Sequence, residues 1–373
     1  MNDPYSSFPF LFLCTSQIDS NNDPARYALW YKFDLEEKMD PLVIDESEYG
    51  GPSTKTLTPH YNKASPDCHA WSGSAACVSK LYMFGGDLDC LDVSSESQKD
   101  VFFYDTTTTT TGITSTNWQM YHVRLNAKRH DPVAVTIKDC VYVFGSIAHP
   151  SRIPKPWAEV LDTSSSTIKP LDPQPLDAFL CEGFISCSAV VEDDNEHETK
   201  IILCTASSCF GDRGKLLYYF VNDGRWVDVS GSHPNFFSAA PMTSTSRRSA
   251  VIDGVLYTYH YKKVYAYDLD NQEWFHHPVL GLVEEDAYYY EHDNNRGFVL
   301  DIRDGKLCVG SCSSFPLGED KTSKMLIHYA TFTPLIESGP RAKRAKKIIT
   351  PLVHSKGYHV VHGQHFVDAI AML

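Results

Sequence analysis

The sequence predicts an all-β fold built from a repeated unit of four antiparallel strands, and three observations predict it. Similar short apolar strands begin at residues 81, 141, 201, 255 and 306, which are 60, 60, 54 and 51 residues apart, and all but the one at 255 end at glycine or another small residue. Turn dipeptides typical of β-hairpins, such as Asp253-Gly254 and Asp304-Gly305, precede some of these strands. Strands that end in tyrosine and aspartate follow. A period of about 50–60 residues made of short strands indicates a repeat architecture.

The first two strands of each unit form a hairpin. A first apolar run, such as residues 132–137, 249–252 or 297–302, precedes the strand that ends in glycine. The clearest example of that second strand is "LYMFGG", residues 81–86. Only this unit keeps both glycines, because the next one has Gly145-Ser146.

The third strand ends in an aromatic residue and aspartate, as in residues 100–105 and 263–268. A tryptophan then opens the fourth strand, and Tyr267 and Trp274 are seven residues apart. In the first full unit this distance is doubled, because the threonine-rich stretch 106–117 lengthens the turn. We interpret that stretch as an insertion in an exposed loop, since loops tolerate added length at little cost.

Four strands, a glycine pair, then tyrosine and tryptophan resemble the kelch motif, so the chain resembles a kelch-repeat β-propeller of the galactose oxidase type. The resemblance covers about residues 68–334. It implies that Gly85 and Gly86 end the second strand of their blade, where the lack of a side chain permits tight packing against the neighbouring blade.

The two ends of the chain predict a sixth blade. Residues 10–16, 27–34 and 41–46 have the pattern of second, third and fourth strands, but no first strand precedes them. The C-terminal "HFVDAIAML", residues 365–373, has the first-strand pattern. Pairing it with residues 10–16 closes the ring and removes two open sheet edges. We therefore expect one six-bladed domain over residues 1–373, with one blade from 365–373 and 8–46, and the others at about 68–125, 129–171, 183–230, 247–280 and 296–353.

Composition excludes some classes of partner. The formal net charge of −14 disfavours nucleic acid and anionic membrane surfaces. The apolar stretch 8–14 is too short for a membrane span. The 11 cysteines include no CxxC pair and indicate buried thiols in a reducing compartment. We expect a cytoplasmic monomer. The basic stretch 341–347 leaves a nuclear address as the alternative, although we prefer a solvated connection between two strands of the fifth blade.

No motif for a cofactor or metal is found. The N-terminus leads into a blade strand within ten residues, which leaves no room for the F-box or BTB domain of kelch-type ubiquitin ligases. The Glu-x3-Asp-x3-His series with which plant nitrile-specifier proteins bind iron has no match, and no copper-ligand pattern like that of galactose oxidase is present. We therefore predict no cofactor and no bound metal.

A site is expected where the innermost strands begin, because these strands line the central channel and their preceding loops share one face with the loops after the second strands. Arginine, histidine and aromatic residues occur at these points in several blades, and they concentrate positive charge in an otherwise acidic protein. The candidate ligand-binding residues are His69, Trp71, Arg129, Trp157, Arg247, Arg248, Tyr290 and Arg296.

Two functions remain open. The first is a stand-alone kelch propeller that binds an acidic peptide segment or an anionic small molecule on this face. The alternative is a cofactor-free isomerase, cyclase or lyase of specialised metabolism, in which His130 or His365 transfers a proton and an arginine holds an anion. The fold alone does not distinguish them.

Overall fold

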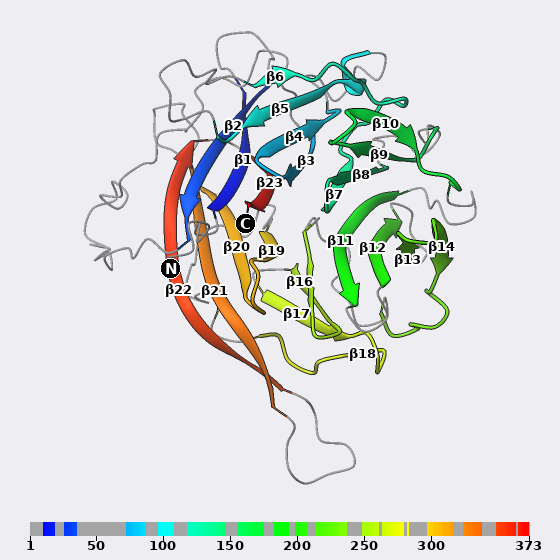
Figure 1. Ribbon diagram of the computed structural model, residues 1–373. Coiled ribbons are helices and arrows are strands. Elements are labelled where there is room, and N and C mark those ends of the chain that lie inside the picture. The colour runs from blue at the N-terminus through cyan, green and yellow to red at the C-terminus, as the bar shows by residue number, and fades with distance from the viewer. Residues whose placement is uncertain are drawn as a thin grey trace, which may run out of the picture.

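The chain forms six antiparallel sheets that surround a central axis like the blades of a propeller, as the computed structural model shows (Figure 1). The predicted all-β, six-bladed fold is confirmed. The structure describes residues 10–18, 26–35, 72–86, 96–107, 118–145, 155–174, 183–193, 198–207, 214–236, 248–260, 263–279, 282, 297–315, 324–337, 348–362 and 365–372.

Five of the six blades are meanders of four strands, in which strands adjacent in sequence are also hydrogen-bonded neighbours. The first four-stranded blade along the chain contains β3 (Gly73–Cys77), β4 (Lys80–Phe84), β5 (Val101–Asp105) and β6 (Gln119–Met120). A short 3₁₀ helix, η1 (Glu96–Lys99), precedes β5. The next contains β7 (Val133–Ile137), β8 (Cys140–Phe144), β9 (Ala158–Asp162) and β10 (Thr167–Pro170). The third contains β11 (Gly183–Asp193), β12 (Glu198–Ser207), β13 (Lys215–Phe220) and β14 (Arg225–Asp228).

The remaining two blades with four strands follow the same order. One contains β15 (Ala250–Ile252), β16 (Val255–His260), β17 (Lys263–Asp268) and β18 (Glu273–Trp274). The other contains β19 (Gly297–Asp301), β20 (Leu307–Phe315), β21 (Lys324–Glu337) and β22 (Ile348–His362). The last two strands are much longer than the others and extend away from the ring (Figure 1).

The closing blade joins both ends of the chain, as predicted. The order of its strands is β23 (His365–Met372), β1 (Phe10–Ile18) and β2 (Arg26–Asp34), and β1 pairs with β23 from Phe10↔Met372 to Ser16↔His365. The expected fourth strand, residues 41–46, lies outside the described residues. Because β23 occupies the inner edge of β1, this sheet is closed on the channel side by the C-terminal strand.

The glycine pair packs against the neighbouring blade, which confirms the role expected for it. Both glycines have positive φ angles, 61° for Gly85 and 93° for Gly86. A Cβ atom on Gly85 would lie 2.5 Å from the carbonyl oxygen of Arg129, in the next blade. The amide of Gly86 donates to that same oxygen at 2.9 Å. A side chain at this point would therefore push the two blades apart.

Apolar side chains fill the space between blades. One cluster joins Phe12 and Trp30 of the closing blade to Met83 and Trp118 of the next blade. The two tryptophan rings lie 5.4 Å apart between their centroids. Within the described residues, no helix is long and apolar enough to span a membrane.

Candidate functional site

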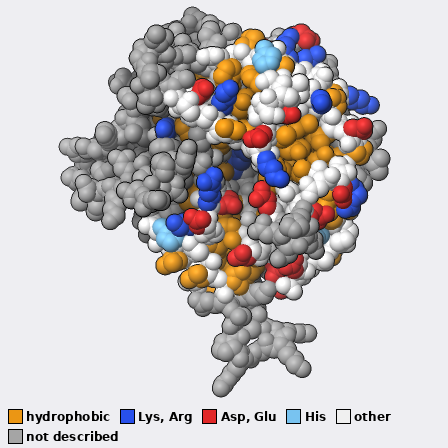
Figure 2. All heavy atoms as spheres, in the orientation of Figure 1, with side chains coloured by type: hydrophobic (Ala, Val, Ile, Leu, Met, Phe, Trp, Pro, Cys, Tyr) orange, Lys and Arg blue, Asp and Glu red, His pale blue; other side chains and the backbone are white. Residues whose placement is uncertain are grey.

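The central channel is lined by the first strand of each blade. These strands are β23, β3, β7, β11, β15 and β19, and neighbouring members of the set contact each other around the axis. Each has one edge without a strand partner in its own sheet, so backbone N–H and C=O groups point towards the axis. Figure 2 shows a hollow at the centre of the ring, with both basic and acidic side chains around it.

Arg248 crosses this channel. It lies just before β15, and its guanidinium donates from Nη1 to the carbonyl oxygen of Ala134 on β7 at 2.8 Å and from Nη2 to that of Ser74 on β3. The blade that contains β3 lies across the ring from the blade that contains β15 (Figure 1). The arginine therefore fixes a positive charge at the channel and satisfies two carbonyls on the edges of inner strands.

The backbone of Arg248 also joins neighbouring blades. It forms a parallel bridge with Ser188 of β11, and the amide of Ser249 donates to the Ser188 carbonyl at 3.0 Å. On the other side, the Val299 amide of β19 donates to the Arg248 carbonyl at 3.1 Å. Arg248 thus contacts four inner strands besides its own, and this position agrees with the prediction that it faces the axis.

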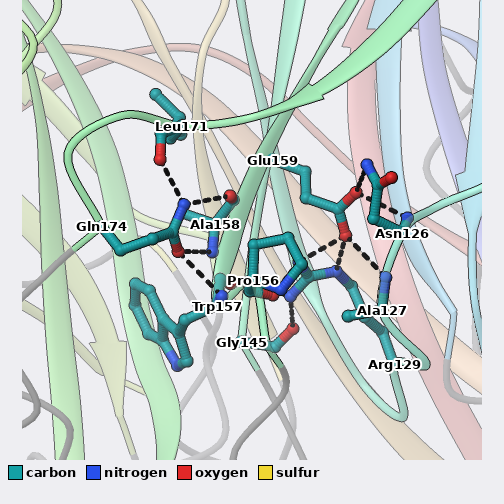
Figure 3. Close-up of polar contacts among 10 residues, drawn as sticks. All are labelled: Asn126, Ala127, Arg129, Gly145, Pro156, Trp157, Ala158, Glu159, Leu171 and Gln174. Atoms are coloured by element: carbon teal, nitrogen blue, oxygen red, sulfur yellow. Dashed lines mark hydrogen bonds and ion pairs between the residues drawn. The ribbon is translucent and has the colours of Figure 1, made fainter.

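Arg129 has a different environment from the one expected. Its side chain is completely buried and forms an ion pair with Glu159 of β9, with 2.7 Å between Nη2 and Oε1. Nε also donates to Glu159, Nη1 donates to the carbonyls of Gly145 and Trp157, and Nη2 donates to that of Pro156 (Figure 3). All five N–H groups of the guanidinium are therefore used within the protein.

Glu159 is the centre of this network. Its carboxylate accepts hydrogen bonds from the backbone amides of Asn126 and Ala127 at 2.7 and 3.2 Å and from the Asn126 side chain at 2.7 Å (Figure 3). Burial lowers the pKa of the Arg129 guanidinium, and the nearby carboxylate opposes this shift. The expectation that Arg129 faces solvent is wrong, because its guanidinium forms a buried ion pair with Glu159 of β9.

Trp157 is likewise a core residue. Only 8% of it is exposed, and its ring packs against Phe144 and Trp226 with centroids 6.0 and 5.8 Å apart. The Gln174 side chain holds its backbone, since Oε1 accepts from the amides of Trp157 and Ala158 at 2.8 and 3.0 Å (Figure 3). The predicted position on an open face is therefore wrong for Trp157. Apolar packing between two blades accounts for its burial.

The two candidate histidines lie near the starts of inner strands. His130 is half-buried, follows Arg129 and comes three residues before β7. His365 is the first residue of β23, where its backbone pairs with Ser16. Its side chain is not among those described. The remaining predicted residues lie outside the described part of the chain, and they are His69, Trp71, Arg247, Tyr290 and Arg296.

Sequence reasoning missed two kinds of residue. Glu159 is the first, although an acid inside the apolar run "AEVL" was a signal of a buried charge that needs a partner. The second is a pair of buried histidines in other blades. The Nδ1 atom of His233 is 3.0 Å from the hydroxyl oxygen of Tyr267, and burial lowers the pKa of His233. Burial also lowers the pKa of His260, to about 4.

Nothing in the described ranges brings three or more histidine, cysteine, aspartate or glutamate side chains close enough to hold a metal ion. The absence of a metal and of a cofactor stays a prediction.

The fold and channel together define a six-bladed β-propeller. No protein-family model matches the chain, and no curated protein matches it in sequence. Among solved structures, YjhT matches with a TM-score of 0.46 and 11% identity, over 86% of this chain and 94% of the other. The β-propeller domain of the Trilobed protease from Pyrococcus furiosus matches with a TM-score of 0.32 and 11% identity, over 96% of this chain and 95% of the other.

A third structure is the extracellular domain of the putative hybrid two component system BT4673 from B. thetaiotaomicron, with a TM-score of 0.38 and 12% identity. The match covers 90% of this chain and 45% of that one. At these scores the similarities carry no argument about function.

Proposed function

We propose that the chain is a stand-alone propeller of the kelch type that binds an acidic or anionic ligand at the mouth of its central channel, with Arg248 as the principal contact. A cytoplasmic or nuclear location belongs to the same proposal. The observation that carries it is the guanidinium of Arg248, which crosses from β15 to the carbonyl oxygens of Ser74 and Ala134.

Two features of this arrangement favour an anion. The carbonyl oxygens of Ser74 and Ala134 are neutral acceptors, so these two contacts orient the guanidinium and do not themselves neutralise it. Orientation of the guanidinium by acceptors on two inner strands, β3 and β7, also reduces the side-chain entropy that a flexible arginine would lose on binding. In a protein with a net charge of −14, a fixed positive charge in a central hollow attracts anions selectively.

The kelch assignment is supported by the glycine pair and by the tyrosine and tryptophan of the outer strands. Gly85 and Gly86 contact the next blade through Arg129. Tyr267 pairs across the sheet with Trp274, and Tyr219 pairs in the same way with Trp226.

Binding of a labelled hexaglutamate peptide, followed by fluorescence anisotropy at low and at physiological salt, tests the proposal. We expect wild type to bind and Arg248→Gln to weaken binding by roughly 1–3 kcal/mol, the scale of a charge-assisted hydrogen bond. Glutamine keeps an amide donor for the channel carbonyls but removes the charge. Inorganic phosphate as competitor shows whether a small anion occupies the same place.

Arg225→Ala is the matched control, because Arg225 is an exposed arginine on the outer strand β14. We expect the Arg225→Ala variant to bind the hexaglutamate peptide with the affinity of wild type. Equal binding by Arg248→Gln contradicts the proposal. So does a large loss of melting temperature in that variant, because Arg248 would then serve only to hold the ring together.

A further inference from the structure

Two cysteines of the third blade lie side by side between its first two strands. Cys187 of β11 and Cys204 of β12 are direct cross-strand partners. Their Sγ atoms are 3.0 Å apart, and the two residues are 1% and 0% exposed. This separation is shorter than an ordinary contact between two sulfur atoms, yet longer than the bond of about 2.05 Å in a disulfide.

The backbone around the pair is held in place. The register of β11 against β12 shifts between Ile185 and Cys187, so Ser186 is the extra residue of a β-bulge. Its hydroxyl donates to the carbonyl of Cys204 at 3.1 Å. Because Cys187 and Cys204 lie directly opposite each other, their side chains project from the same face of the sheet, as a cross-strand disulfide requires.

The other described cysteines do not share this arrangement. Cys308 and Cys312 both lie on β20, and their cross-strand partners on β21 are Thr331 and Ile327. Cys77 directs its Sγ to the Lys138 carbonyl at 3.4 Å and to the Thr163 hydroxyl at 3.7 Å. No disulfide joins any two of the described cysteines.

We propose that Cys187 and Cys204 form a reversible intramolecular disulfide when the protein meets a peroxide. One thiolate attacks hydrogen peroxide, its S–O bond forms as the O–O bond breaks, and the product is a sulfenic acid and hydroxide. The second thiol then attacks the sulfenic sulfur, the S–S bond forms, and water leaves. Overall, two thiols and one peroxide give one disulfide and two waters, with both electrons coming from the sulfurs.

The position of the pair makes the reaction slow and selective. Burial raises the pKa of the Cys204 thiol well above its ordinary value, and the contact with Cys187 raises it further. Both residues belong to the cluster that packs this blade against Leu256 and Tyr267 of the next one. A peroxide therefore reaches them through a local opening, after which the neighbouring thiol traps the sulfenic acid before further oxidation.

The site is also next to the channel. Ser188, which follows Cys187, forms the bridge with Arg248. A disulfide would fix β11 to β12 directly beside this contact between two blades.

The test uses the full-length chain in two arms. In one, folded, reduced protein is incubated with hydrogen peroxide below its melting temperature. In the other, unfolded protein is refolded in a glutathione redox buffer. Remaining thiols are alkylated under denaturing conditions, and unreduced peptides are identified by mass spectrometry. We expect one peptide pair that joins Cys187 to Cys204, has lost two hydrogens and disappears after treatment with dithiothreitol.

Two variants complete the experiment. Cys187→Ser is expected to abolish the linked peptide and leave Cys204 alkylated, whereas Cys308→Ser, at another fully buried cysteine, is expected to keep the link. The proposal is overturned when the peroxide arm gives no link, whether or not the refolding arm gives one, when Cys187 or Cys204 is joined to a different cysteine, or when the main product is a sulfinic acid at either position.

Discussion

Arg129 and Glu159 form an ion pair that is wholly shielded from solvent, with 2.7 Å between Nη2 and Oε1 and both side chains 0% exposed. The arginine lies on the segment before β7 and the acid lies on β9, so the pair fixes the loop before the inner strand to the third strand of the same blade. The Arg129 carbonyl in turn contacts Gly85 and Gly86 of the preceding blade. This one arginine therefore connects two blades.

Breaking this pair is expected to destabilise the fold strongly. Arg129→Ala leaves a buried, unpaired carboxylate and should lower the free energy of unfolding by about 3–5 kcal/mol in urea titrations. Arg124→Ala is the control, because Arg124 is 46% exposed in its ion pair with Asp100 and its loss should cost at most about 1 kcal/mol. Equal effects of the two substitutions would contradict the structural role of Arg129.

The double variant Arg129→Met with Glu159→Leu gives an independent check. Removing both charges avoids the unpaired ion, so its loss of stability should be smaller than the sum of the two single losses. Additive losses would show that the two side chains stabilise the fold separately.

Alanine at Gly85 is expected to separate two adjacent blades. At Gly305, which also has a positive φ of 67° and open space where a Cβ atom would lie, alanine should cost only about 1 kcal/mol of conformational strain. At Gly85 the same strain applies, and the new methyl group meets the Arg129 carbonyl. We expect Gly85→Ala to cost at least about 1 kcal/mol more in chemical denaturation. Equal losses would mean that the close approach is relieved by a small shift.

The buried His260 should make the protein less stable in mild acid. Its pKa is lowered from 6.5 to about 4 in the folded state because burial disfavours the imidazolium. Between these two values the unfolded chain binds more protons, so the free energy of unfolding falls as the pH falls. We expect His260→Gln to reduce the loss between pH 7 and pH 4 by about 1–3 kcal/mol. An unchanged slope in urea titrations across this range would contradict it.

The closing strand β23 should be required for a stable ring. Deletion of residues 366–373 removes the partner of β1 and exposes the apolar side chains of two blades, so most of the stability should be lost. Leu352→Glu, at a position on β22 that is 52% exposed, should melt like wild type in differential scanning calorimetry. A truncated protein with the wild-type melting temperature would show that the closure is dispensable.

Local sequence patterns were sufficient to predict the architecture of the propeller. The repeated second strand, the turn dipeptides and the first-strand pattern of residues 365–373 report hydrogen bonding and side-chain alternation between near neighbours in a hairpin. The six blades and their closure could be predicted from them. The packing role of Gly85 and Gly86 was implied by the resemblance to the kelch motif, and the absence of a side chain is what permits the close contact between blades.

The direction of the charged side chains was decided by tertiary structure. Arg129 and Arg248 both precede an inner strand, yet one is buried against Glu159 and the other reaches across the channel. The acceptors of Arg248 belong to residues 114 and 174 positions earlier in the chain, and no local pattern records that distance. An arginine just before an inner strand faces the axis or the interior according to the hydrogen-bond acceptor that lies opposite it. Only the closed ring brings the arginine and that acceptor together.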